Sequence, residues 1–312
     1  MVWRAYSYRI ITPAEAGAMT ADAPSAALAA EPATLSLTLE SRPETLTLVR
    51  GMLSGVAELL SMDPELLDDL KTAVSEACNN VVLHAYPNGS GPLAVSLNAA
   101  QAGIEVLVRD AGVGIPEHAS ADDRVQGVGL PVIRALTDKA EFRPCQGGGT
   151  EVWMHFAGQR DGRPLFQRPD MAAPDDGFSK HLAGDAVVSV SPIGLLGGVL
   201  GRLSRALAAS ARFSLDRFSD VYLVTDAIAA HSSVAASGER IGFAIRAGGR
   251  RLELTVGPLR AGSGEKLRTE GHGGDAPSPL ELLSDQLECH DVGGYELLRV
   301  VMVDHRRWPA SS

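Results

Sequence analysis

Cysteine is scarce in this sequence. Cys78, Cys145 and Cys289 lie far apart, form no C-x-x-C pair and leave one cysteine over after any pairing. This pattern excludes a disulfide framework and a zinc ribbon, and it is typical of a protein of the reducing cytosol. A signal peptide needs an apolar stretch of about 7–15 residues, whereas the first residues offer only Ile10 and Ile11. We therefore expect a cytoplasmic protein.

Positive charge and long apolar runs are also lacking. Lys and Arg total 28 against 38 for Asp and Glu, which leaves a formal net charge of -10 at pH 7. Because there is no basic run, we expect no direct binding to nucleic acid or to an anionic membrane. The longest apolar stretch, residues 193–201, is far shorter than the roughly 20 residues that span a bilayer. We therefore expect no membrane segment.

The length and composition are those of a globular chain. Its 312 residues are 45% hydrophobic and 21% charged, which excludes wholesale disorder. At roughly 150 residues per domain, the length suggests two domains. Residues 1–33, however, are Ala, Pro and small polar residues without a period, and we expect a disordered lead-in there.

Hydrophobic periodicity predicts the first elements of the chain. Residues 34–39 alternate apolar and polar side chains, as a half-buried strand does. Ser41 and Glu44 have the spacing of a capping box, and Asp63 stands where an N-cap would begin a second helix. The side chains expected to face the core are Val49, Leu53, Val56 and Leu60 in the first helix and Leu66, Leu70, Val74, Ala77 and Val81 in the second.

A hairpin, a helix and a strand are expected next, at residues 93–98 and 103–109, 128–137 and 151–156. Because the strands pair as neighbours while the helices cluster, the expected fold class is α/β (α+β). It is a two-layer sandwich with a mixed sheet and helices on one face. We expect this first domain to span residues 34–157.

The order of elements recurs in the second half. Residues 158–184 are rich in Gly, Pro, Asp and Arg without a period, which predicts a linker. A strand, two helices, a hairpin, a helix and a strand are then expected again within residues 185–306, with Ser214 as an N-cap. The matching order favours a diverged duplication of the fold.

Four segments of the first half combine acidic or amide residues with glycine. They are Glu76-Ala-Cys-Asn-Asn80 continuing to His84-Ala-Tyr86, Asp110-Ala-Gly-Val-Gly114, Gly127-Val-Gly-Leu130 and Gly147-Gly-Gly-Thr150. Taken singly, the first is explained as a solvated pair of helix side chains and the others as turns. Taken together, they contain all the parts of a Mg-nucleotide site.

The helix and strand residues of these segments have suitable chemistry. Glu76 and Asn80 flank the apolar stripe of the second helix, at the rim of the core. An amide oxygen such as that of Asn80 suits one position of a Mg²⁺ that also binds phosphates and water. Asp110 ends a strand, where its carboxylate can accept a hydrogen bond from an exocyclic amine.

The glycines suit a ligand that approaches the backbone. Gly112 and Gly114 leave room where a Cβ would obstruct the ligand. Gly127 and Gly129 precede a helix, and the free N–H groups and positive end of a helix N-terminus favour phosphate.

In these segments the sequence resembles the GHKL (Bergerat-fold) ATPase superfamily and, within it, the anti-sigma-factor serine-protein kinases of the RsbW-like family. The resemblance covers about residues 35–156. It is carried by the string E-A-x-x-N-x-x-x-H-A-Y from Glu76 to Tyr86, followed in order by D-x-G-x-G, G-x-G-L and G-G-T. It implies the histidine kinase/HSP90-like ATPase fold with ATP and Mg²⁺ as cofactors.

The resemblance also implies roles for single residues. Glu76 would be the general base and Asn80 the Mg²⁺ ligand. The implied nucleotide contacts are Asn80, Asp110 as the adenine reader, Gly112, Gly114, Gly127, Gly129, Leu130, Gly149 and Thr150. His84 belongs to the motif but is equally well explained as a packed helix histidine. Arg124 is within reach of phosphate but is more simply explained as a solvated loop arginine.

The implied reaction is phosphoryl transfer to a serine or threonine of a partner protein, an anti-sigma antagonist. The expected partners are a sigma factor, its antagonist or both, and a homodimer is left open. An ATP-dependent module that sequesters a sigma factor without turnover is the alternative. A sensor histidine kinase is disfavoured because no histidine precedes His84, and the loop at residues 115–126 is short for a topoisomerase- or chaperone-like ATPase.

The second half departs from the family pattern at the key positions. The residues expected where the first half has Glu76, Asn80, Asp110 and Gly112 are Asp226, Ala230, Pro258 and Arg260. Loss of the metal ligand and the adenine reader predicts a second domain that binds no nucleotide.

Overall fold

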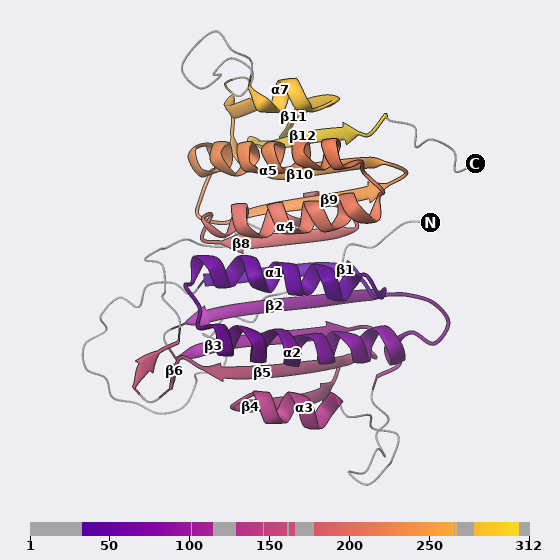
Figure 1. Cartoon of the computed structure of the whole chain (residues 1–312), viewed down its shortest axis with the longest axis vertical. Coiled ribbons are helices and arrows are strands. Elements are labelled where there is room, and N and C mark those ends of the chain that lie inside the picture. The colour runs from indigo at the N-terminus through magenta and orange to yellow at the C-terminus, as the bar shows by residue number, and fades with distance from the viewer. Residues whose placement is uncertain are drawn as a thin grey trace.

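The computed structural model describes residues 33–100, 102–114, 129–145, 147–160, 162–165, 178–264, 266 and 278–305. Ten strands form one sheet in the order β11-β12-β10-β9-β8-β1-β2-β3-β5-β4, with helices side by side on one face (Figure 1). The predicted two-layer sandwich is confirmed. Its sheet is not mixed, however, because every strand pair in it is antiparallel. No helix among these residues is long and apolar enough to cross a membrane.

The first half contains the elements that periodicity predicts, and one strand that it missed. They are β1 (Ala33–Glu40), α1 (Thr45–Leu59), α2 (Pro64–Asn80), the π-helical turn η2 (Val81–Ala85), β2 (Pro92–Ala100), β3 (Gly103–Asp110), α3 (Gly129–Leu136), β4 (Lys139–Pro144) and β5 (Thr150–Ala157). The nine side chains predicted to face the core from α1 and α2 are all buried. The missed strand, β4, lies at the sheet edge and has no fully buried residue, so its hydrophobic signal is weak.

Of the two helix starts predicted in the first half, one is confirmed and one is wrong. The side chain of Asp63 caps α2 by accepting hydrogen bonds from the N–H groups of Glu65 (2.9 Å) and Leu66 (3.3 Å). At α1 the N-cap is Glu44, without a side-chain cap. Ser41 instead accepts a hydrogen bond from the N–H of Gly91 (3.1 Å), since the tertiary contact takes its hydroxyl away from the helix.

The segment expected to be a linker carries short elements. Strands β6 (Gln159–Arg160) and β7 (Arg163–Pro164) form a small hairpin, and a 3-10 turn, η3, spans Phe178–His181. The carbonyl of Leu165 accepts a hydrogen bond from the N–H of Asp63 (2.8 Å), which holds the end of this hairpin against the start of α2.

The second half repeats the element order of the first. It contains β8 (Ala186–Ser191), α4 (Leu195–Ser210), α5 (Leu215–Ala235), β9 (Ile241–Gly248), β10 (Arg251–Arg260), α7 (Pro279–Leu283), β11 (Gln286–Val292) and β12 (Tyr295–Val303). The described helices lie in the layer order α3, α2, α1, α4, α5, α7, so the two halves are arranged about a pseudo-twofold axis at the middle of the sheet (Figure 1).

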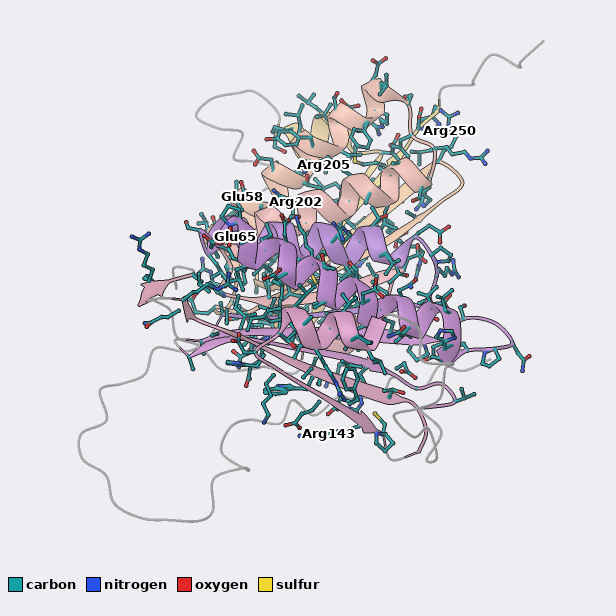
Figure 2. The ribbon with its side chains drawn as sticks, turned by 60° about the horizontal axis from the view of Figure 1, so that its bottom comes forward. Glu58, Glu65, Arg143, Arg202, Arg205 and Arg250 are labelled. Atoms are coloured by element: carbon teal, nitrogen blue, oxygen red, sulfur yellow. The ribbon has the colours of Figure 1, made fainter. Side chains whose placement is uncertain are left out.

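The halves meet through one strand pair and one helix pair. Strand β1 pairs with β8 as well as with β2, with Leu35 opposite Val190. Helix α1 packs on α4, where Glu58 pairs with Arg202 (3.0 Å; Figure 2). Because a single cluster of buried apolar side chains runs through both halves, they share one hydrophobic core.

The buried residues also set the register between the halves. Asp63 and Ser214 are the N-caps of α2 and α5. From these caps, Leu70 and Ala77 correspond to Val221 and Ile228, and all four are completely buried. In this register Glu76 corresponds to Ala227 and Asn80 to His231. The sequence-based match of Asp226 and Ala230 to these positions is therefore wrong by one residue, because it relied on a short identity rather than on the helix start.

Candidate functional site

Asp110 is a buried acidic residue held by two backbone donors. It is the last residue of β3, and only 5% of its surface is exposed. Its Oδ1 accepts a hydrogen bond from the N–H of Gly112 (2.8 Å), and its Oδ2 accepts one from the N–H of Thr150 (3.1 Å). Burial raises the pKa of the Asp110 carboxyl above its usual range, and these two donors partly oppose that shift. Each oxygen keeps acceptor capacity for a further donor.

Glycines allow the segments around Asp110 to touch. A Cβ on Gly149 would lie 2.2 Å from the carbonyl oxygen of Asp110, and one on Gly114 would lie 3.2 Å from the carbonyl oxygen of Gly149. Gly114 and Gly149 also have φ values of 75° and 92°, which favour glycine. The structure therefore brings Asp110, Gly112, Gly114, Gly149 and Thr150 together, while their roles toward a ligand stay predictions.

The motif that begins at Glu76 ends in a π-helical turn. Helix α2 gives way to η2 directly after Asn80, and such turns are frequent at functional sites. The carbonyl oxygen of Ala85 accepts a hydrogen bond from the N–H of Val113 (2.9 Å), and a Cβ on Gly112 would lie 2.1 Å from that oxygen. The glycine loop after β3 is thus docked on the end of the motif.

Tyr86 joins three parts of this site, a role that sequence reasoning missed. Its hydroxyl donates to the carbonyl oxygen of Pro92 (2.6 Å) and accepts from the N–H of Ala111 (2.8 Å). Its ring lies so close to Gly91 that a Cβ there would be 2.2 Å from a ring carbon. Tyr86 is the last letter of the motif string, so the signal was present, but only the fold shows what its hydroxyl contacts.

Glu76 and Asn80 lie on one flank of α2, and both are half-buried. Helix α2 packs on α3, which carries Leu130, and on β3, which carries Asp110. His84 is exposed, so the interpretation of a packed helix histidine is wrong.

Helix α3 supplies the last predicted contacts. Gly129 is its first residue, Leu130 is half-buried in its first turn, and the fully buried Ile133 anchors it to the core. Gly127 and Arg124 lie outside the described residues, and their roles stay predictions.

The side chains near Asn80 suit a metal ion that takes most of its ligands from a nucleotide and from water. In the described part of the chain, no group of three or more His, Cys, Asp and Glu side chains could hold a metal ion. Mg²⁺ usually keeps several waters and takes phosphate oxygens besides one or two protein ligands. The half-buried amide of Asn80 fits the place of such a single protein ligand.

The corresponding end of the second half is filled by its own side chains. Pro258 replaces the carboxylate of Asp110, and Arg260, which replaces Gly112, donates to the carbonyl oxygen of Val234. A carboxylate returns on β12, where Glu296 accepts hydrogen bonds from the N–H groups of Gly262 (2.6 Å) and Gly264 (2.7 Å). Backbone donors after β10 are therefore occupied by a side chain of the same half.

Comparison with known proteins matches the first half. Residues 39–156 match the family of histidine kinase-like ATPase domains. The serine-protein kinase RsbW of Halalkalibacterium halodurans is 31% identical over 130 residues, which cover 38% of this chain and 80% of that protein. RsbW of Oceanobacillus iheyensis is 33% identical over 122 residues, covering 35% of this chain and 77% of that protein.

Among solved structures, the RsbU and RsbW domains of Rv1364c from Mycobacterium tuberculosis are 22% identical, with a TM-score of 0.33 over 45% of this chain and 34% of that chain. The sequence matches span most of the length of the RsbW proteins. The family match at residues 39–156 includes all four motif segments. The chain therefore belongs to the RsbW-like serine-protein kinase family, within the histidine kinase-like ATPases.

Proposed function

We propose that this protein is an ATP-dependent anti-sigma regulatory factor that phosphorylates a serine or threonine of a partner, an anti-sigma antagonist. The observation that carries the proposal is the geometry of Asp110. It is a buried carboxylate, held by the N–H groups of Gly112 and Thr150, with acceptor capacity left for the amine of adenine. The relatives of this chain are serine-protein kinases, which supports the same reaction here.

The residues of the first half divide the work. Asp110 selects adenine, and the glycine loop lets the backbone approach the nucleotide. Glu76 accepts the proton of the attacking hydroxyl, and a positioned general base of this kind contributes about 10²–10⁴-fold to a rate. Asn80, one helical turn further on, offers its amide oxygen to Mg²⁺. When bound, Mg²⁺ neutralises charge on the transferred phosphoryl group.

Glu76→Gln in the full chain tests the kinase proposal. The variant keeps the size of the side chain but removes the base. Binding of Mg-ATP, measured by calorimetry, should persist, while transfer of labelled phosphate to a partner recovered by pull-down should fall about 10²–10⁴-fold. Glu65→Gln is the matched control, because Glu65 lies on the same helix with its side chain 84% exposed. Transfer by Glu76→Gln at the wild-type rate would contradict the proposed role.

The same assay separates the alternative function. A wild-type protein that binds ATP and a sigma factor, yet transfers no phosphate to any recovered partner, would be a sequestering module without turnover. The pull-down should be made with ATP and with ADP, so that the partners recovered with each nucleotide can be compared.

We also propose that the second half, residues 185–306, is a diverged copy that binds no nucleotide. The repeated element order and the shared positions of the caps Asp63 and Ser214 support the common origin. The bonds of Arg260 and Glu296 within the second half support the loss of binding.

A further inference from the structure

Helix α5 exposes large apolar side chains on its solvent-facing side. Tyr222 is 54% exposed and Leu223 is 49% exposed. The neighbouring helix α7, which packs on α5, exposes 65% of Leu282. Groups of exposed apolar side chains mark interaction sites more often than single ones do.

The first half shows that the fold does not require these side chains. Helix α2 is flanked by α1 and α3 as α5 is flanked by α4 and α7. In the register set by the two N-caps, Tyr222 and Leu223 stand where α2 has Lys71 and Thr72. The same helix in the same layer is therefore stable with polar residues there, so the fold does not require the apolar pair.

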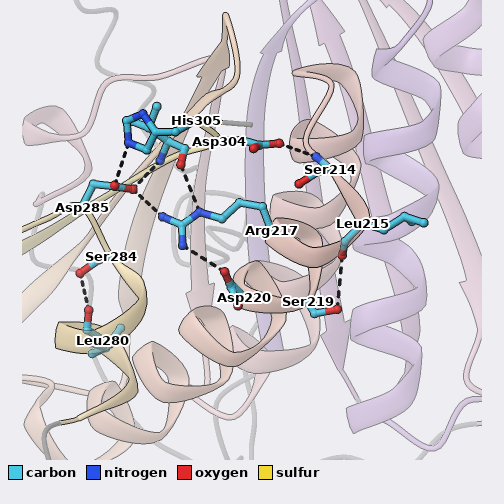
Figure 3. Close-up of polar contacts among 11 residues, drawn as sticks. Ser214, Leu215, Arg217, Ser219, Asp220, Leu280, Ser284, Asp285, Asp304 and His305 are labelled. Carbon is cyan, nitrogen blue, oxygen red and sulfur yellow. Dashed lines mark hydrogen bonds and ion pairs between the residues drawn. The ribbon is translucent and has the colours of Figure 1, made fainter. Parts of the chain in front are cut away.

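Acidic residues stand next to these apolar residues along the same two helices. Asp226, one turn after Tyr222 and Leu223 on α5, and Glu281, beside Leu282 on α7, are exposed. The arginine of the same helix is engaged elsewhere. Arg217 bonds Asp220 (3.0 Å), Asp285 and the carbonyl oxygen of Val303 (3.2 Å), as Figure 3 shows. Positive charge beside the surface comes from Arg205 of α4, whose guanidinium lies over the Tyr222 ring at 5.4 Å.

We infer that Tyr222, Leu223 and Leu282 form a docking surface for an amphipathic helix of a partner protein that carries Lys or Arg beside its apolar face. An apolar helix face would cover the three side chains, and its basic flanks would meet Asp226 and Glu281. This site lies on the second half, so it goes beyond the proposed kinase function and does not depend on it.

Replacing the pair by its first-half counterparts tests the inference. The full chain carrying both Tyr222→Lys and Leu223→Thr should fold as the wild type does, because α2 already holds these residues at the matching places. The probes are two synthetic 18-residue helical peptides with Leu on one face and either Lys or Glu on the other. Fluorescence anisotropy at about 0.15 M salt, where charges more than about 8 Å apart are largely screened but charges in close contact still interact, should show binding of the Lys peptide alone.

The double variant should weaken binding of the Lys peptide at least about tenfold, which corresponds to 1.4 kcal/mol. Leu282→Ala should weaken it as well. Leu215→Thr is the matched control, since Leu215 is 87% exposed at the start of the same helix. The affinity of this control variant for the Lys peptide should stay near that of the wild type.

Three results would overturn the inference: no binding of the Lys peptide to the wild type, equal binding to the double variant, or equal loss in Leu215→Thr. Concentration-dependent self-association of the wild type that the double variant abolishes, measured by sedimentation velocity, would instead assign the surface to a second copy of the chain. Loss of kinase activity in Glu76→Gln leaves these results unchanged, so the two proposals fail separately.

Discussion

Gly55 of α1 meets Gly198 of α4 so closely that a Cβ on Gly55 would lie 2.7 Å from the carbonyl carbon and oxygen of Gly198. The contact lies beside the β1–β8 pair, where the two halves join. Because the halves share one hydrophobic core, a disturbance of this contact should be felt by the whole molecule.

Gly55→Ala should therefore destabilise the full chain. The clash is with backbone, which cannot rotate away, and overpacking of this kind costs about 1–3 kcal/mol. Gly51→Ala is the control on the same helix, since the nearest atom to its Cβ would be the Cβ of Arg202 at 3.7 Å. That variant should gain up to about 1 kcal/mol from helix propensity. Urea unfolding followed by circular dichroism measures both, and Gly55→Ala as stable as Gly51→Ala would contradict the close contact.

Asp110→Asn should lose ATP binding. An amide can present a donor toward the adenine amine and can accept through only one of its two groups, so it cannot replace both carboxylate oxygens. A hydrogen bond to a charged group contributes about 1.5–3 kcal/mol, so the affinity measured by calorimetry should drop at least about tenfold. Unchanged affinity would remove Asp110 from the adenine-reading role.

The buried carboxyl of Asp110 should make both the stability of the protein and its affinity for ATP depend on pH. Because burial raises the pKa of its carboxyl, the folded protein takes up this proton at a higher pH than the unfolded chain does. Ionised Asp110 therefore costs stability above its folded pKa, and this cost disappears as the pH falls through that value. The affinity for ATP should instead weaken as the pH falls through this range. Melting and calorimetry from about pH 7 to pH 4 check this, and Asp110→Asn should lack this contribution to stability.

Tyr86→Phe should weaken ATP binding without unfolding the protein. The ring stays against Gly91, but the N–H of Ala111 loses its acceptor and the carbonyl of Pro92 loses its donor. Each such bond contributes about 0.5–1.5 kcal/mol. The residue after Asp110 is then held less firmly, which should lower ATP affinity several-fold without loss of the folded state. Equal affinities of variant and wild type would show that Tyr86 does not position this loop.

The full chain should bind one nucleotide. The second half has Pro258 and Arg260 in place of Asp110 and Gly112, and its own Glu296 occupies the backbone donors after β10. Calorimetry with Mg-ATP should give one site per chain, and Arg260→Ala should leave that number unchanged. Two sites per chain would place a second nucleotide site in the second half.

Much of the first half could be read from local sequence. The apolar period predicted the inward faces of α1 and α2, because helix geometry repeats within a few residues. Asp63 predicted the start of α2 for the same reason, since a cap bonds backbone two and three residues away. The resemblance also implied that residues 110–114 and 147–150 belong to one site, and these two segments lie together at Asp110.

Contacts between residues that are far apart in the sequence could be known only from the tertiary structure. Ser41 has the spacing of a cap, yet it bonds Gly91, because a long-range contact took its hydroxyl. The sequences of β1 and β8 do not indicate that the two strands pair, because any edge strand offers unpaired backbone groups. The two strands are neighbours in a structure in which α1 packs on α4. The bonds of Tyr86 depend likewise on β2 and β3 lying beside η2, an arrangement that requires the whole sheet.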